Sequence, residues 1–199
     1  MRRNDERRTA LADAAIDVLA AEGARGLTFR AVDARAGVPA GTASNYFANR
    51  DALLAAAGTR VFTRLAPDPD AVERALAAPR DQALVARFLR EIVDRATADR
   101  AGHLALLELR LESTRKPELG ASFTATMSAA LRENIAFHLD AGLPGDRAAV
   151  ELLYAAMTGL IVEHLTLPEF FPRETVDRLV DLLVDRVARV PGRGRGLSG

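Results

Sequence analysis

Apolar residues recur along this chain at the spacings of three and four positions that an amphipathic helix requires. Between residues 4 and 22, for example, Leu11, Ala15 and Val18 share one helical face. The same periodicity, interrupted by glycine and proline, predicts helices over about 4–22, 28–36, 39–47, 50–65, 71–78, 81–98, 102–114, 117–141 and 146–167, and a last helix that ends near residue 190. No segment shows the short alternation bounded by turns that a strand needs. The pattern therefore predicts an all-α fold.

Residues 27–54 contain two short predicted helices around a tight turn. Thr28 can cap the first helix with its hydroxyl, and Gly37 stands where a helix end favours a left-handed residue. Pro39 suits the first position of the second helix, and Asn49 can cap the helix that follows. Two short helices joined by a glycine-containing turn have the geometry that places the second helix in the major groove of DNA. We therefore predict a helix-turn-helix.

The same segment resembles a known family. It is similar to the DNA-binding domain of the tetracycline-repressor-like (TetR) family of bacterial transcription regulators in Ala36-Gly37-Val38, Gly41-Thr42, Tyr46-Phe47 and Asn49-Arg50-Asp51-Ala52-Leu53-Leu54. Beyond this segment the resemblance rests on the order of the helices. It implies a three-helix DNA-binding domain at 1–49 and a larger helical effector-binding and dimerisation domain at 50–190. The glycine-rich residues 191–199 are expected to be disordered.

The resemblance gives the second helix of the motif the role of reading DNA bases. Asn45 can pair with adenine through two hydrogen bonds, and hydroxyl and methyl groups beside it can contact bases or phosphates. Arginines near the N-terminus and around the motif can bind phosphates, although the chain has 27 basic and 27 acidic residues and a net charge of zero. Phe47 is expected in the core. The expected DNA-binding residues are Arg2, Arg3, Arg7, Thr28, Arg30, Thr42, Ala43, Ser44, Asn45, Tyr46 and Arg50.

The last two predicted helices carry apolar stripes broader than a single core would cover. The stripe of the final helix repeats in alternating steps of four and three, as in a coiled-coil seam. The resemblance implies that two such helices from each subunit form a four-helix dimer interface, and the alternative is that both helices pack only into their own core. The expected interface residues are Leu153, Leu160, Val176, Val180, Leu183 and Val187.

A small-molecule pocket is expected in the larger domain. Flexible and aromatic side chains lie there near a few polar groups on long helices, as in many ligand sites. Each of these residues, taken alone, is also compatible with an ordinary buried or surface position. The expected pocket residues are His103, Phe123, Met127, Asn134, Phe137, Tyr154 and Met157.

Enzymatic and membrane functions find little support in the sequence. Cysteine is absent, the three histidines are far apart, and no His-Glu-x-x-His motif occurs, so no metal site, cofactor or catalytic residue is expected. The segment Gly120–Thr124 lacks the second glycine of a nucleophile elbow. No apolar run approaches the roughly 18–20 residues that cross a bilayer. A cytoplasmic protein is therefore expected.

These observations together favour a homodimeric transcriptional repressor that binds a palindromic operator in double-stranded DNA. A small apolar effector in the larger domain would release it. Two alternatives stay open: a helix-turn-helix regulator without an effector, and an all-α ligand-binding or enzymatic domain whose N-terminal part contacts another protein.

Overall fold

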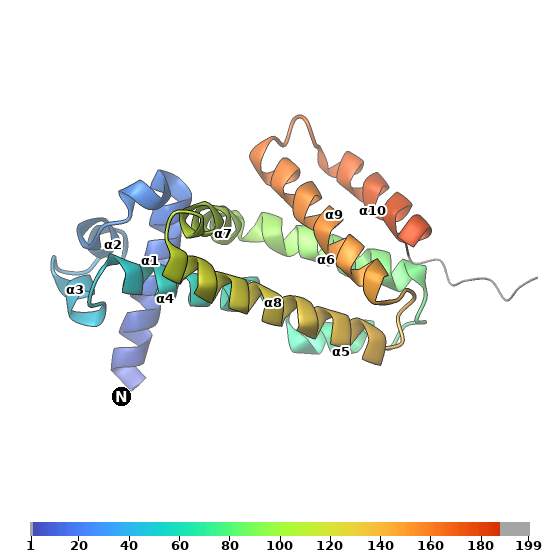
Figure 1. Ribbon diagram of the computed structural model, residues 1–199, viewed down its shortest axis with the longest axis horizontal. Coiled ribbons are helices and arrows are strands. Elements are labelled where there is room, and N and C mark those ends of the chain that lie inside the picture. Colours follow the sequence, from blue (N-terminus) through green and yellow to red (C-terminus); the bar gives the residue numbers. More distant parts are fainter. Residues whose placement is uncertain (1, 188–199) are drawn as a thin grey trace, which may run out of the picture. The chain divides into compact units, whose positions relative to one another are not determined.

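The computed structural model describes the backbone of residues 2–187 and the side chains of residues 4–187, and this part of the chain contains ten helices and no strand. The all-α prediction is therefore confirmed (Figure 1). The helices are α1 (Arg2–Gly26), α2 (Phe29–Arg35), α3 (Thr42–Tyr46), α4 (Arg50–Leu65), α5 (Pro69–Ala75), α6 (Gln82–Ala98), α7 (Arg100–Ser113), α8 (Pro117–Asp140), α9 (Arg147–Thr166) and α10 (Arg173–Val187). The expected tail at 191–199 lies outside the described residues.

Most helix boundaries lie within two residues of those expected from local signals, and α1, α3 and α5 differ more, with α5 running from Pro69 to Ala75 instead of 71–78. The side chain of Thr28 accepts a hydrogen bond from the amide of Ala31, and that of Asn49 caps α4 in the same way. The helix α1, however, continues beyond its expected end through a kink at Gly23, which has a φ of 69°. The helix α3 begins later than the sequence suggested, because Gly41 at its N-cap is left-handed with a φ of 89°. Pro39 therefore lies in the turn and not in the helix.

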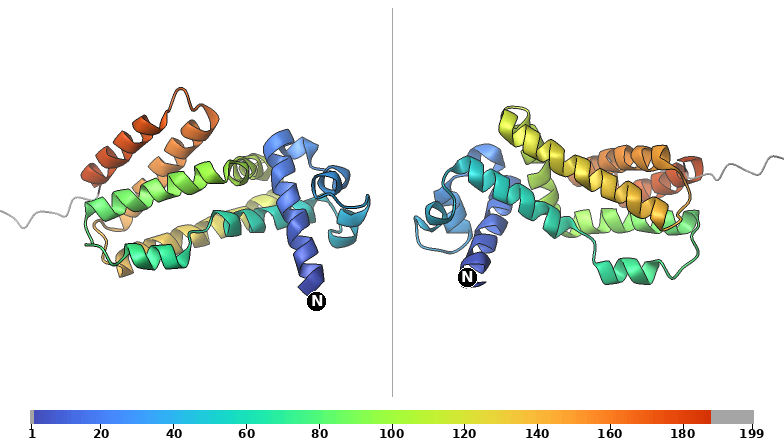
Figure 2. Two further views of the ribbon diagram at one scale, coloured as in Figure 1. Left: turned by 180° about the vertical axis from the view of Figure 1, so that it is seen from behind. Right: turned by 60° about the horizontal axis from the view of Figure 1, so that its bottom comes forward.

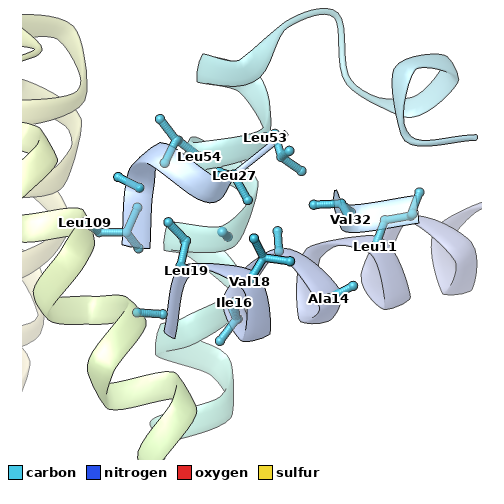
Figure 3. Packing of buried hydrophobic residues seen from close by; sticks show 14 of the residues in the cluster. Leu11, Ala14, Ile16, Val18, Leu19, Leu27, Val32, Leu53, Leu54 and Leu109 are labelled. Carbon is cyan, nitrogen blue, oxygen red and sulfur yellow. The ribbon is translucent and has the colours of Figure 1, made fainter. Parts of the chain in front are cut away.

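The described chain forms two compact units. The first comprises residues 2–66 and 98–127, and the second comprises 67–97 and 128–187, so α8 contributes its two halves to different units. In the first unit, apolar side chains from α1, α4 and α7 meet in one core, in which Leu19, Leu54 and Leu109 are fully buried (Figure 3). The helices α4 and α7 therefore complete the core of the helix-turn-helix, although the sequence boundary at residue 49 assigned them to the other domain.

Arg60 and Arg64 hold α4 in this first unit through ion pairs. Arg60 of α4 donates two hydrogen bonds to Asp13 of α1, at 2.9 and 3.0 Å. Arg64 binds Asp99, which also caps α7 through the amide of Gly102. Burial disfavours the charged form of Asp99, but the hydrogen bonds from Arg64 and Gly102 outweigh burial and hold the pKa of Asp99 below its ordinary value. The network therefore stabilises the fold only while Asp99 is ionised.

The second unit has its own core, built from α5, α6, α9, α10 and the turn that follows α8. Met157 of α9 and Val180 of α10 are buried there, as is Val93 of α6. The helices α9 and α10 lie side by side, joined by a short loop, in Figure 1 and in both views of Figure 2. Arg173, at the start of α10, is paired with Asp94 and Asp177. These contacts fix the position of α10 on α6 and α9.

Among the described residues, α9 is long and apolar enough to span a membrane by length and composition. The sequence was expected to contain no apolar segment of this length. A buried helix of a globular protein passes the same test, and one face of α9, including Leu153 and Ile161, packs into the second core. We therefore treat α9 as a core helix.

Candidate functional site

The helix-turn-helix is assembled from α2, α3 and the turn between them. Val32 of α2 and Ala43 of α3 are fully buried in the first core, and Phe47, just after α3, is 1% exposed. Gly37 and Gly41 bracket the turn with left-handed backbone, at φ values of 64° and 89°. An added Cβ would meet nothing within 4 Å at either glycine, so a side chain would fit there. Glycine is favoured at both positions because of the left-handed backbone conformation.

One of the expected DNA-binding residues on α3 is wrong. Ala43 is completely buried and cannot reach DNA, because it is the residue through which α3 packs on the core. Ser44 and Asn45 are exposed, and Tyr46 is half-buried against the core. The hydroxyls of Thr42 and Ser44 donate to the carbonyls of Pro39 and Gly41, at 2.6 and 2.8 Å. Asn45 is therefore the α3 residue best placed to contact a base, because its side chain is exposed and takes no part in these hydrogen bonds.

The expected phosphate ligands fall into three groups. Arg7, Thr28 and Arg30 are exposed, as a backbone contact requires. The side chains of Arg2 and Arg3 lie outside the described residues. Arg50 forms the third group and differs from expectation, because it binds acceptors of the protein itself.

The guanidinium of Arg50 is turned toward the protein. Its Nε donates to the carbonyl of Leu27 at 3.2 Å, its Nη2 donates to the carbonyl of Ala24, and its Nη1 donates to Glu112 at 3.2 Å. Glu112 belongs to α7, and its side chain is only 11% exposed. A second carboxylate of α7, that of Glu108, accepts a hydrogen bond from the amide of Ala24. This geometry does not support a phosphate contact by Arg50, because each of its three guanidinium nitrogens already donates to an acceptor within the chain.

Two residues bind the ends of α3 in a way that the sequence did not predict: Asp33 had no expected role, and Arg8 was expected, with the other N-terminal arginines, to contact DNA. The carboxylate of Asp33, in α2, accepts hydrogen bonds from the amides of Gly41 and Ala43, each at 2.7 Å. Arg8, in α1, donates to the carbonyl of Tyr46 at 2.7 Å and lies 4.6 Å above the centre of the Phe47 ring. No local pattern marks either residue, because both act across the fold.

The expected pocket residues are divided between the two units. His103, Phe123 and Met127 belong to the first unit, where Phe123 stacks against the Phe62 ring at 6.0 Å. The Nδ1 atom of His103 is buried and has no hydrogen-bond partner among the described residues. Burial lowers the pKa of His103, with Arg110 adding to the effect and Asp99 opposing it.

The other expected pocket residues lie in the second unit. Tyr154 is half-buried and Met157 is buried. Phe137 is 40% exposed and packs edge-on against Phe88. Asn134 is exposed, because the buried face of this part of α8 is formed by Ile135 and His138. Asn134 therefore does not line an enclosed apolar site in this structure.

An open groove of about 550 Å³ lies between α9 and α10. Apolar side chains of both helices line it, and two of them, Leu152 and Leu182, are 53% and 41% exposed. Glu163 lines it near the end of α9 and Arg186 near the end of α10. Because the two helices run in opposite directions, these charges lie at opposite ends of the groove.

Only part of the expected dimer interface lies at the groove. Leu160, Leu183 and Val187 line it, as the coiled-coil pattern suggested. Leu153, Val176 and Val180 do not, because they are at most 4% exposed and form the chain's own core. The periodic stripe on α10 therefore combines two adjacent faces, one buried within the chain and one open to solvent.

Comparison with known proteins agrees with this architecture. Residues 11–57 match the family described as bacterial regulatory proteins, tetR family, and residues 80–186 match the tetracyclin repressor-like C-terminal domain. Among the curated proteins, none matches this chain.

Solved structures of the same fold are more informative. A TetR family member from Streptomyces coelicolor A3 is 26% identical, with a TM-score of 0.68 and coverage of 93% of this chain and 99% of that one. A putative TetR-family transcriptional regulator from Rhodococcus sp. is 24% identical, with a TM-score of 0.68 and coverage of 93% and 100%. The multidrug binding protein EbrR, complexed with imidazole, is 27% identical, with a TM-score of 0.64 and coverage of 94% and 92%.

The two family matches cover the helix-turn-helix and most of the remaining helices, in the order that the structure shows. The C-terminal match alone spans more than half of the chain. Members of this family are transcriptional regulators and not enzymes. The chain belongs to the tetracycline-repressor-like (TetR) family and is a transcriptional regulator with an N-terminal helix-turn-helix that binds DNA.

Proposed function

We propose that this regulator is a cytoplasmic homodimeric repressor, that it binds a palindromic operator, and that a small, largely apolar effector releases it. The observation that carries the proposal is the apolar groove between α9 and α10. A contiguous apolar surface with exposed leucines is unfavourable on a monomer and marks an interaction site. We retain 1–49 and 50–190 as a division of function: DNA binding in the first, dimerisation and effector binding in the second.

The charges at the groove support a second copy of this chain as its occupant. A two-fold axis across the groove brings each end of one subunit against the opposite end of its partner. Glu163 of one chain then faces Arg186 of the other, twice in the dimer. The surface is therefore self-complementary in charge as well as apolar.

Two-fold symmetry has a direct consequence for the DNA. Each copy of α3 enters one major groove, and the two half-sites are separated by one helical turn, about 34–36 Å. The operator is therefore an inverted repeat. Selection of bound sequences from random DNA tests this, and recovery of a single half-site without symmetry would contradict it.

The dimer is tested by sedimentation of two matched leucine variants. Leu182→Asp places a charge in the groove, whereas Leu139→Asp places one on an α8 leucine of similar exposure, 46% against 41%, that does not line the groove. We expect Leu182→Asp to sediment as a folded monomer and Leu139→Asp as a dimer. Arg186→Glu should weaken the dimer, and adding Glu163→Arg should restore it. A wild-type chain that is monomeric at micromolar concentration would refute the interface.

The proposed effector is small and aromatic or otherwise largely apolar. EbrR has been solved with imidazole and with ethidium, and it is 27% and 25% identical to this chain in those two structures. In the first unit, the half-buried side chains of Phe123 and Met127 and the buried Nδ1 atom of His103 are candidates for contacting such a compound. In the second unit, the half-buried side chain of Tyr154 is a separate candidate.

An effector releases the operator only if it prefers the state that does not bind DNA. By linkage, operator DNA must then weaken effector binding by the same factor. Titration of the protein with ethidium, followed by other planar aromatic compounds, with and without the selected operator, measures this factor directly. If every compound that binds shows equal affinity in both titrations, the regulator without an effector is the better description.

A further inference from the structure

The reading helix α3 is only five residues long, and its own sequence supplies little to hold it. A helix of this length is not stable alone. Its N-cap is Gly41, which has no side chain to accept a hydrogen bond from the first turn. The amides at the N-terminus and the carbonyls at the C-terminus of α3 therefore need partners from elsewhere in the fold.

Asp33 supplies the partners at the N-terminus. One carboxylate oxygen accepts from the Gly41 amide and the other from the Ala43 amide, each at 2.7 Å. Asp33 is itself 2% exposed, so water does not compete for these bonds. A carboxylate forms stronger hydrogen bonds than a neutral acceptor, and its negative charge is favourable at the N-terminus of a helix.

Arg8 supplies the partner at the C-terminus. Its Nη1 donates to the carbonyl of Tyr46, the last residue of α3, and its guanidinium lies over the ring of Phe47. Phe47 is buried in the core, so the cation–π contact ties Arg8 to a fixed point. The positive charge is favourable at the C-terminus of a helix, as the negative charge is at the N-terminus.

We propose that Asp33 and Arg8 are positioning residues for operator recognition, a pair of opposite charges that hold the two ends of α3 so that Asn45 and its neighbours reach the bases in register. Neither residue needs to touch DNA for this role. Asp33 is buried, and the Arg8 guanidinium is directed to the protein's own Tyr46 carbonyl. Loss of either should therefore reduce discrimination between sequences and leave the phosphate contacts unchanged.

Asp33→Asn tests the N-terminal contact with little change of volume. An amide has one oxygen, so one of the two backbone amides loses its acceptor and faces an N–H₂ group instead. The matched control is Asp68→Asn, which changes the cap of α5 in the second unit. Affinity of the full chain is measured for an operator selected from random DNA and for a duplex with the same bases in scrambled order.

We expect Asp33→Asn to lose about tenfold or more in affinity for the operator, the scale of a mismatched base pair. Affinity for the scrambled duplex and its salt dependence should not change, and Asp68→Asn should behave as the wild type. Hydrogen exchange should show faster opening of the Gly41 and Ala43 amides. Unchanged operator preference in a folded Asp33→Asn, or equal loss on both duplexes, would overturn the proposal.

Arg8→Gln provides an independent test if Asp33→Asn does not fold. A phosphate ligand and a positioning residue differ in salt dependence, because each phosphate contact contributes about −0.9 to the slope of log K against log salt. We expect Arg8→Gln to lose operator preference with an unchanged slope. Its neighbour Arg7, which is exposed, is the control, and Arg7→Gln should make the slope shallower and keep the preference. A shallower slope for Arg8→Gln would make Arg8 a phosphate ligand and refute its positioning role.

The inference rests on α3 reading the operator, and that premise has its own test. Asn45→Ala should relax base preference while the hydrogen exchange of Gly41 and Ala43 stays slow. If Asn45→Ala has no effect on base preference, α3 is not the reading element. If Asn45→Ala relaxes base preference and the Asp33 and Arg8 variants do not, α3 still reads the operator, and only the positioning role of Asp33 and Arg8 is refuted.

Discussion

Arg50 offers the sharpest test of whether a basic residue beside the helix-turn-helix serves the DNA or the fold. The substitution is Arg50→Ala. It removes hydrogen bonds to the carbonyls of Ala24 and Leu27 and the partner of Glu112, in a network that joins α1, α4 and α7. The structure therefore predicts a loss of stability and no loss of a phosphate contact.

The size of the effect follows from the number and surroundings of these bonds. A hydrogen bond contributes about 0.5–1.5 kcal/mol, and one to a charged group about 1.5–3 kcal/mol. The Arg50 side chain is 36% exposed, so water replaces part of what is lost, and Glu112 keeps Arg115 and Lys116 within 4.0 Å. We therefore expect the free energy of unfolding to fall by about 2–3 kcal/mol. For a chain of this size that lowers the melting temperature by about 4–12 °C.

The assay combines thermal unfolding with the salt dependence of DNA binding, both at one protein concentration. Arg30→Ala is the matched control, because Arg30 is exposed at the start of α2. We expect Arg30→Ala to melt as the wild type and to make the slope of log K against log salt shallower by about 0.9. Arg50→Ala should melt earlier and keep the wild-type slope when binding is measured well below its melting temperature.

A double-mutant cycle with Glu112→Gln isolates the pair. If Arg50 and Glu112 act together, their effects on stability should be non-additive by roughly 0.5–3 kcal/mol. An Arg50→Ala variant with unchanged melting and a shallower slope would refute the reasoning, because Arg50 would then be a phosphate ligand whose contacts within the chain contribute nothing.

Three further predictions concern other parts of the structure. Leu109→Ala should cost about 2–5 kcal/mol of stability by chemical denaturation, because Leu109 is fully buried in the first core, and a smaller cost would mean that the core collapses around the gap. Stability should fall as the pH drops below about 6.5, because the folded chain lowers the pKa of His103 and so binds fewer protons than the unfolded chain; His103→Gln should flatten this part of the curve, and an unchanged curve would contradict it. The lowered pKa of Asp99 adds a second loss at lower pH, as the pH falls from the unfolded pKa through the folded one, and Asp99→Asn should remove it.

The fold could be predicted from the sequence because its signals are local. Helix periodicity, proline and glycine breaks and side-chain caps each act within a few residues, and α4, from Arg50 to Leu65, has the bounds that these signals predict. The late start of α3 was not predicted, because Pro39 is compatible with a helical first position and the left-handed backbone of Gly41 is not visible in the sequence.

The proposed dimer surface could be predicted only in part. A stripe with steps of three and four identifies the apolar side of a helix but does not say which neighbour covers it. Val176 and Leu183 belong to one stripe, yet Val176 packs inside the chain and Leu183 lines the open groove. The difference depends on how α10 is rotated against α9, and only tertiary packing determines that rotation.

The roles of the charged residues divide by sequence separation. Hydrogen bonds between residues three apart, such as Asn49 with the amide of Ala52, were predicted from cap preferences. The contact of Arg8 with Tyr46 spans 38 residues, and that of Arg50 with Glu112 spans 62. An arginine near a helix-turn-helix carries the same charge in either role, so composition and spacing assign it to phosphate by default. Only the acceptors around its guanidinium decide the role, and for Arg8 and Arg50 those acceptors belong to the protein itself.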